Sequence, residues 1–311
     1  MKRSIVMLAS AVLLLSATAQ AQNSGPIRFQ ITAGGTNLYK LAIPLPIGDY
    51  GPQRLAKMVQ EVASNDLSLA GFFRVLDPKA YLANLAAEGL SINPPDWTNI
   101  GAAGVIKARV TPFGDNVSFE FRLYDVSQGN QPVLTKSYRG TMANARLLVH
   151  QWASDVVKYY TGEDSFFNSR IAFSSGASGR RRDLMVMDWD GAGVHAITNR
   201  SQNLMPAWSP SGAELAFTSY LGGKPDLYLI AAGGGRPKLL SARPGLNMGA
   251  AFSPDGREIC ATLSQDGNSE LYLLSTAGAI IKRLTHTPFI DTSCSWSPDG
   301  KRIAFVSDRF G

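Results

Sequence analysis

The second half of the chain repeats one alternating pattern of apolar and polar positions. A short apolar strand ends in an aromatic residue and is followed by a Ser-Pro-Asp-Gly turn, a second strand, a polar loop and a third strand. The aromatic residue recurs every 44 residues, at Trp208, Phe252 and Trp296. A period of this length with several short strands per unit is typical of a β-propeller blade. The pattern therefore predicts an all-β propeller of WD40-like repeats.

The repeats also predict an incomplete ring over residues 163–311. Serine, proline and glycine occupy the first, second and fourth positions of a type I turn in Ser253–Gly256. A weaker copy around Ile171–Phe173 lacks an inner strand, and the sequence stops at Gly311 after a second strand. Only about three and a fraction blades are present, whereas closed propellers have roughly four to eight. We therefore expect a C-terminally truncated chain whose first blade lacks its closing strand.

The region before the repeats alternates helical and strand patterns. Apolar residues recur at helical spacing over Arg54–Leu67 and over Ala143–Tyr160, and Val117–Val126 alternates apolar and polar residues as strands do. Asp77-Pro78 predicts the start of a further helix, with aspartate at the N-cap. Together these patterns predict an N-terminal α/β domain over residues 22–162.

The first residues predict a secretory signal peptide over residues 1–21. Two basic residues precede an apolar run, and small residues of the Ala-x-Ala type follow it, so we expect cleavage between Ala21 and Gln22. The apolar run is shorter than the ~20 residues that a membrane-spanning helix needs. We therefore expect an exported, soluble mature chain.

Composition and candidate chemistry exclude several function classes. The formal charge of +6 is spread along the chain, so no nucleic-acid-binding patch is predicted. Cys260 and Cys294 fall in different strands of different repeats, so we expect no disulfide between them. No metal-binding or cofactor-binding cluster is evident, and Gly176–Gly179 is one residue short of a hydrolase nucleophile elbow.

An export signal, an α/β domain and Trp-Ser-Pro-Asp-Gly propeller repeats in this order resemble the TolB family, the periplasmic propeller proteins of the Tol-Pal system. The junction segments Tyr159–Gly162 and Ser169–Phe173 are also similar to that family. The resemblance implies six blades at full length, a periplasmic location, no cofactor and no enzymatic activity. It also implies binding to the lipoprotein Pal and to TolA, in support of outer-membrane integrity and envelope constriction in cell division.

The resemblance assigns the two partners to two segments. Pal would contact the loops that lead from the outer strand of one blade into the inner strand of the next, at Met205, Leu246, Asn247, Met248, Asp291 and Thr292. TolA would bind a short apolar strand in a polar, glycine-rich segment, at Ile27, Arg28, Phe29, Gln30 and Ile31. An edge strand of the α/β domain explains that segment equally well.

One alternative function stays open. Similar propeller repeats precede the catalytic domain in prolyl-oligopeptidase-type peptidases, so the chain would then be the propeller portion of a secreted peptidase whose catalytic domain is missing. The leading α/β domain and the signal peptide favour the binding function over this alternative.

Overall fold

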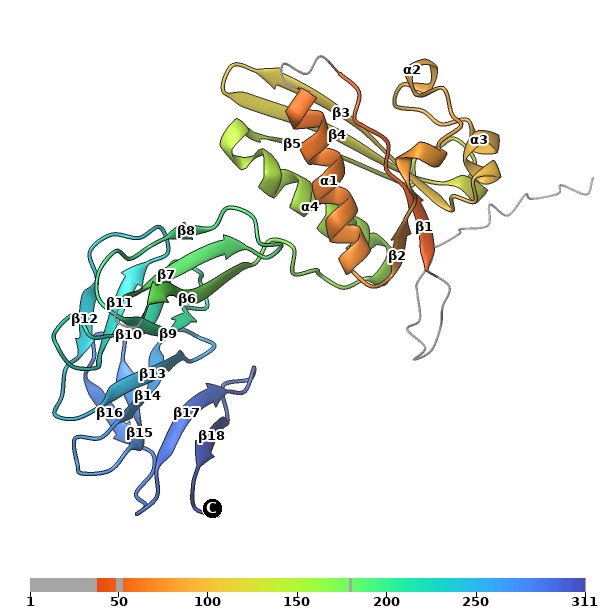
Figure 1. Ribbon diagram of the computed structural model, residues 1–311. Helices are drawn as coiled ribbons and strands as arrows, with labels where there is room; N and C mark the ends of the chain where they lie inside the picture. The colour runs from red at the N-terminus through yellow and green to blue at the C-terminus, as the bar shows by residue number, and fades with distance from the viewer. Residues whose placement is uncertain (1–37, 49–52, 179–180, 311) are drawn as a thin grey trace, which may run out of the picture.

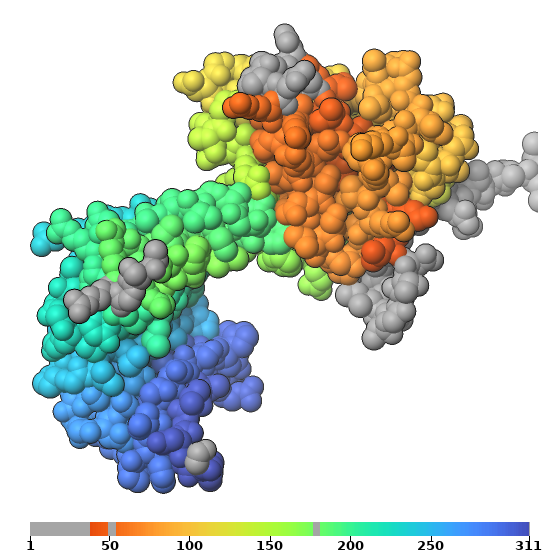
Figure 2. Space-filling model, viewed as in Figure 1, coloured from red at the N-terminus to blue at the C-terminus, as the bar shows by residue number. Residues whose placement is uncertain are grey.

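The computed structural model describes residues 38–48, 53–178 and 181–310 (Figure 1). It contains an α/β domain followed by four further sheets, which form an unclosed arc of a propeller. In Figure 2 this arc curves away from the N-terminal domain. The expected cleavage site Ala21–Gln22 and the segment Ile27–Ile31 lie outside the described residues. Within the described ranges, no helix is both long and apolar enough to cross a membrane.

The N-terminal domain is built on a five-stranded sheet with the order β2-β1-β3-β4-β5. Strand β1 pairs in parallel with β2 and β3, and β4 pairs antiparallel with β3 and β5. The elements are β1 (Tyr39–Ala42), α1 (Gln53–Leu69), β2 (Phe73–Val75), α2 (Leu85–Glu88), α3 (Pro94–Asn99), β3 (Gly104–Phe113), β4 (Asn116–Asp125), β5 (Leu134–Thr141) and α4 (Ala145–Thr161), with 3₁₀ turns at Pro78–Ala80, Val126–Gln128 and Met142–Asn144.

The two long helices, α1 and α4, pack side by side on one face of this sheet (Figure 1). Their apolar stripes face the sheet, so that Val59 and Val62 of α1 and Trp152 of α4 are buried. The Trp152 ring stacks on Phe121 of β4, with ring centroids 5.0 Å apart. Both helices and the strand over Val117–Val126 are where the sequence pattern predicts them, to within two residues.

A helix starts at Asp77-Pro78 as predicted, but it is only a short 3₁₀ turn, Pro78–Ala80. The carboxylate of Asp77 does accept the backbone N–H of Lys79, at 3.0 Å, as an N-cap would. The turn nevertheless ends at Ala80, because Tyr81 has an extended backbone. The Tyr81 hydroxyl accepts the backbone N–H of Ile43 at 2.9 Å, and this tie to the sheet replaces the continuation of the helix.

The other face of the sheet carries a buried ion pair beneath α2 and α3. Lys107 of β3 places its Nζ 2.6 Å from Oε2 of Glu88, with both side chains less than a tenth exposed. Glu88 also accepts the indole N–H of Trp97, at 3.0 Å. Since both charges are removed from water, each depends on the other, and the pair fixes α2 and α3 on the sheet.

The propeller part consists of one three-stranded, two four-stranded and one two-stranded sheet. The strands are β6 (Arg170–Ser178), β7 (Arg181–Asp188) and β8 (His195–Ala196); β9 (Asn203–Trp208), β10 (Glu214–Ser219), β11 (Asp226–Ala231) and β12 (Lys238–Ser241); β13 (Asn247–Phe252), β14 (Glu258–Leu263), β15 (Glu270–Ser275) and β16 (Ile280–Arg283); and β17 (Asp291–Trp296) and β18 (Ile303–Ser307). Among the described residues β6 pairs only with β7, so the first sheet lacks an inner strand, as expected.

The turns that recur every 44 residues in the repeats are stabilised by their own polar side chains. Ser253 accepts the backbone N–H of Glu258 through Oγ, and Asp255 accepts the backbone N–H of Arg257. Gly256 follows with φ 71, a conformation that glycine adopts without steric cost. These bonds explain why the same residue types return at the same place in each repeat.

The two cysteines are free and lie in different strands of different sheets, as predicted, but the two strands are neighbours in space. Cys260 of β14 and Cys294 of β17 belong to one buried apolar cluster between neighbouring sheets. The hydrogen bond with Cys294, followed by burial, raises the pKa of the Cys260 thiol. The corresponding positions one repeat earlier, Ala216 and Ala250, share a cluster in the same way, so these slots demand small side chains.

We expect neither thiol to react with a thiol-specific reagent in the folded protein. Burial covers both thiols, and the raised pKa of Cys260 further suppresses its thiolate, which is the reactive form. Colour release from dithiobis(nitrobenzoic acid) should be absent in native buffer and should correspond to both cysteines in denaturant. Fast release in native buffer would show that the cluster opens.

Candidate functional site

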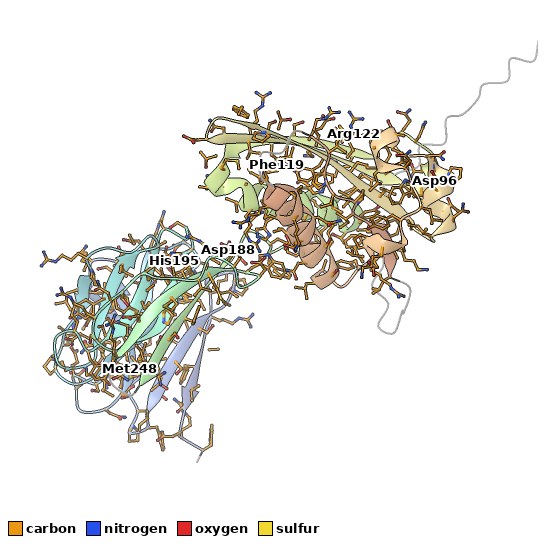
Figure 3. All side chains as sticks on the ribbon, turned by 45° about the horizontal axis from the view of Figure 1, so that its top comes forward. Asp96, Phe119, Arg122, Asp188, His195 and Met248 are labelled. Atoms are coloured by element: carbon orange, nitrogen blue, oxygen red, sulfur yellow. The ribbon has the colours of Figure 1, made fainter. Side chains whose placement is uncertain are left out.

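The propeller sheets have two distinct ends. At one end Arg170 pairs with Asp188, and the chain leads back into the N-terminal domain. At the other end the backbone N–H of Arg182 donates to the carbonyl of Ser201, at 3.1 Å. The connections at that second end are residues 197–202, 220–225, 242–246, 264–269 and 284–290, and we call them, with the first residues of the inner strands that follow, the loop face. In Figure 3 Asp188 lies near the N-terminal domain and Met248 away from it.

Large apolar side chains are exposed on the loop face. Six of them have exposed fractions between 39% and 50%: Met205, Tyr220, Leu221, Leu246, Phe289 and Ile290. They come from loops of three consecutive sheets, and soluble proteins expose such groups together mainly where another protein binds. The loop face is therefore the candidate protein-binding site of the described chain.

The structure separates the predicted Pal-contact residues into two groups. Met205 and Leu246 are exposed, and Met248 and Thr292 are half-buried at the start of β13 and β17. Asn247 and Asp291 are buried, with exposed fractions of 0%. Direct contact of these last two side chains with a partner does not fit their burial, and this part of the prediction needs correction.

Asn247 and Asp291 hold the loops from inside. Asn247 accepts the Ser241 hydroxyl at 2.6 Å and donates to the carbonyl of Arg243 at 2.8 Å. Asp291 accepts Nη2 of Arg309, at 3.0 Å. Burial alone would raise the pKa of the Asp291 carboxyl, but hydrogen bonds from Ser307, Arg309 and Thr287 hold it below its usual value. The carboxylate is thus kept ionised as a loop anchor.

Each inner strand is kinked directly after this anchor. Met205, Gly249 and Ser293 occupy the same place in successive repeats and have φ values of 52, 63 and 57. The pairing of each inner strand shifts register at this point. A bulge of this kind redirects the chain and re-aims neighbouring side chains.

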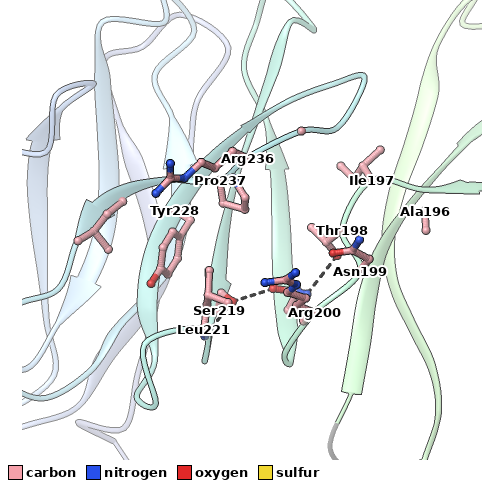
Figure 4. Close-up of a pocket in the computed structure, with 13 residues that line it drawn as sticks. Ala196, Ile197, Thr198, Asn199, Arg200, Ser219, Leu221, Tyr228, Arg236 and Pro237 are labelled. Carbon is pink, nitrogen blue, oxygen red and sulfur yellow. Dashed lines mark hydrogen bonds between the residues drawn. The ribbon is translucent and has the colours of Figure 1, made fainter.

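A pocket lies beside the loop face, between the first and second propeller sheets (Figure 4). It has a volume of about 720 Å³, and its lining includes Arg200 and Arg236 but no aspartate or glutamate. Neither arginine forms an ion pair with the described residues. Leu221 and Leu239 supply apolar walls. The lining of the pocket therefore suits an acidic group.

The sequence pattern placed Phe289 and Ile290 in a predicted partner-binding loop but did not identify Tyr220 and Leu221. Tyr220 and Leu221 follow strand β10, which is buried from Leu215 to Ser219, and in the sequence they look like its continuation. Their position after the end of β10 could have indicated exposure, because an apolar residue beyond the strand end does not reach the hydrophobic core.

The described residues contain one group of three close side chains that offer metal-ligand atoms: Asp66, His150 and Asp190. This group lies between the N-terminal domain and the first propeller sheet. The guanidinium of Arg146 already pairs with Asp190. Because this cation occupies the carboxylate that a metal would need, we assign no metal to the group.

Comparison with known proteins agrees with this architecture. The family model of the TolB amino-terminal domain matches residues 27–132, and that of the TolB beta propeller domain matches residues 157–311. The crystal structure of TolB from Acinetobacter baumannii superimposes with a TM-score of 0.76 at 26% identity, over 88% of this chain and 67% of that one.

Curated relatives carry the same family name. The Tol-Pal system protein TolB of Cereibacter sphaeroides is 35% identical over 243 residues, which cover 76% of this chain and 55% of the relative. That of Geobacter sulfurreducens is 39% identical over 208 residues, or 66% of this chain and 48% of the relative. The chain thus spans about half the length of the curated relatives it matches. With both domain models matched in order on the architecture described above, the chain belongs to the TolB family.

Proposed function

We propose that the chain is a non-enzymatic, periplasmic protein-binding component of the Tol-Pal system. It binds the lipoprotein Pal through the loop face and TolA through Ile27–Ile31, and it supports outer-membrane integrity and envelope constriction during cell division. It associates with the envelope membranes only through these partners. The names of the curated relatives support the system to which it belongs.

The observation that carries the Pal-binding proposal is the set of exposed apolar side chains on the loop face. Met205, Leu246 and Ile290 come from three successive sheets and face solvent without a covering element among the described residues. Apolar anchors of this size commonly carry most of the affinity in protein–protein contacts. Asn247 and Asp291 then act as positioning residues, because they fix the loops that present these anchors.

The direct test is capture of the soluble domain of Pal by the immobilised chain without residues 1–21. Binding should be saturable and should be reduced by free competitor. Circular dichroism verifies that the immobilised chain is folded. A folded chain that captures no Pal would contradict the proposal.

Deletion of Gln22–Ile31 is expected to abolish TolA binding and to leave Pal binding unchanged. The deleted segment precedes the described sheet, whereas the loop face lies at the far end of the propeller part, so the two sites have no residues in common. Both affinities can be measured by calorimetry on one preparation. Survival of TolA binding in the deletion variant would refute the assignment of this segment.

The alternative of a peptidase propeller has less support. The match to the TolB amino-terminal domain covers most of the region before the propeller. This region precedes the propeller repeats, whereas the peptidase interpretation requires a catalytic domain outside this sequence. We therefore do not propose a hydrolase activity.

A further inference from the structure

Four charged or titratable side chains meet between the N-terminal domain and the first propeller sheet. Asp66 comes from α1, Arg146 and His150 come from α4, and Asp190 follows β7; we call these four residues the domain joint. Nδ1 of His150 lies 2.6 Å from Oδ2 of Asp66, and Nε2 of the same ring lies 3.9 Å from Oδ2 of Asp190. The imidazole thus stands between a carboxylate of each part of the molecule.

Three of the four side chains of the domain joint are closed to solvent. The side chains of Asp66, His150 and Asp190 are exposed by 2% or less, and Arg146 by 33%. Trp189 packs on one side of the joint, with its ring centroid 6.5 Å from His150 and 5.0 Å from Phe167. In such surroundings an unbalanced charge is costly, because water cannot solvate it.

The charge balance of the joint depends on one proton. Three carboxylates, those of Asp66, Asp188 and Asp190, face one permanent cation, Arg146, which pairs with Asp190 and lies 3.9 Å from Asp188. His150 supplies the second positive charge only when it is protonated on both nitrogens. Its Nε2 and Oδ1 of Asp66 are buried without a hydrogen-bond partner. A proton on Nε2 would make this unsatisfied nitrogen a donor directed at Asp190. The interaction would then cross the boundary between the N-terminal domain and the propeller part.

We propose that the domain joint is a pH-sensitive lock, in which doubly protonated His150 links Asp66 of the N-terminal domain to Asp190 of the propeller, and loss of that proton loosens the two parts. Histidine is the side chain that ordinarily changes charge between pH 5 and 8. The charged groups facing it are Asp66 from α1, Arg146 from its own helix, and Asp188 and Asp190 from the end of β7 and the turn after it. The lock is therefore closed in mild acid and open in mild alkali.

The neighbouring carboxyl, Asp66, sets the acid limit of the lock. Burial raises the pKa of Asp66 above its usual 3.8, although the hydrogen bond with His150 opposes this. A carboxyl whose pKa is higher in the folded state binds its proton more tightly there than in the unfolded chain. Its contribution to stability is therefore full below pH 3.8 and is lost as the pH rises through the raised value. The lock itself needs the ionised form of Asp66, so it closes where Asp66 has released its proton and His150 still carries both of its protons.

The distance between the two parts, measured at two pH values, tests the lock. Spin labels are placed at Lys57→Cys in α1 and Lys238→Cys in β12, both exposed, in a chain carrying Cys260→Ala and Cys294→Ala. Electron–electron double resonance should give a narrow distance distribution at pH 5.5 and a broad one at pH 8.5. His150→Gln should give the broad distribution at both values, since glutamine cannot take up the proton.

Two further variants keep the result interpretable. His195→Gln alters an exposed histidine of β8 outside the joint and should retain the pH response of the parent. Asp190→Asn removes the propeller-side carboxylate without touching the helices, and it should also be broad at both pH values if His150→Gln does not fold. An identical distribution at pH 5.5 and 8.5 in the parent, or a retained pH response in His150→Gln or Asp190→Asn, would overturn the proposal.

Discussion

Replacing both Met248 and Thr292 with arginine is expected to weaken Pal binding by about 30-fold or more. The two residues lie at the start of neighbouring inner strands, directly beside the exposed groups of the loop face. Losing central apolar contacts at a protein interface commonly costs about 2 kcal/mol or more, which corresponds to this change in affinity. Two added charges beside the exposed apolar side chains would further disfavour burial of those side chains against a partner. Titration calorimetry with the soluble domain of Pal gives the affinity directly.

The matched control places the same charges on exposed apolar residues elsewhere. Ile280→Arg with Ile281→Arg changes the outer strand β16, where both side chains are exposed but do not belong to the loop face. This double variant should bind Pal as the parent does. An equal loss of affinity in both double variants would show that general charge, and not the loop face, governs binding.

Replacement of Lys107 with methionine is expected to destabilise the N-terminal domain by about 3–5 kcal/mol. The substitution leaves the carboxylate of Glu88, whose side chain is 7% exposed, without its cation. The remaining donors, the backbone of Asn93 and the indole of Trp97, are neutral groups and do not balance the charge. Urea unfolding followed by circular dichroism should show an earlier first transition in this variant.

Lys57→Met is the matched control for this effect. Lys57 also pairs with a glutamate, Glu61, at 3.4 Å, but both side chains are more than 60% exposed. An exposed pair of this type contributes about 0.5 kcal/mol or less, because water solvates both charges in its absence. If the two lysine variants unfold at the same urea concentration, burial is not what makes the Lys107–Glu88 pair important.

The strand pattern of the propeller was predictable because each repeat carries its own local signals. The turn residues around Gly256 bond to one another within six residues, so the sequence itself contains the reason for the turn. The failure after Pro78 has the opposite origin. There the helix stops because Tyr81 bonds to Ile43, which directly follows β1 and lies far away in the sequence, and no local pattern reports that contact.

The misassignment of Asn247 and Asp291 shows how polar residues in loops can mislead. Both follow a loop, and exposure is the usual expectation for such residues. Yet Asn203 is also buried one repeat earlier, and it accepts the Ser219 hydroxyl at 2.7 Å. An amide or carboxylate side chain recurs every 44 residues, at Asn203, Asn247 and Asp291, and this recurrence was the sequence signal for a structural role.

The domain joint was beyond the reach of sequence patterns altogether. Asp66, His150 and Asp190 are widely separated along the chain, and each is an ordinary polar residue in its own element. Only the packing of α1 against α4, and of Trp189 against the segment after α4, brings them together. Because the residues of this cluster come from separate parts of the chain, their spacing in the sequence has no regularity that could predict the cluster.

The kink in the inner strands determines which residue type fits the kinked position without strain. Gly249 adopts the left-handed backbone freely, whereas Met205 and Ser293 adopt it at a cost of about 1 kcal/mol each. Glycine at either position would remove that cost, and Met205, being 47% exposed, adds little to the interior. The Met205 side chain is therefore both strained at its backbone and exposed, and nothing within the described part of the isolated chain compensates for this strain. Its presence is best explained by a contact with another molecule.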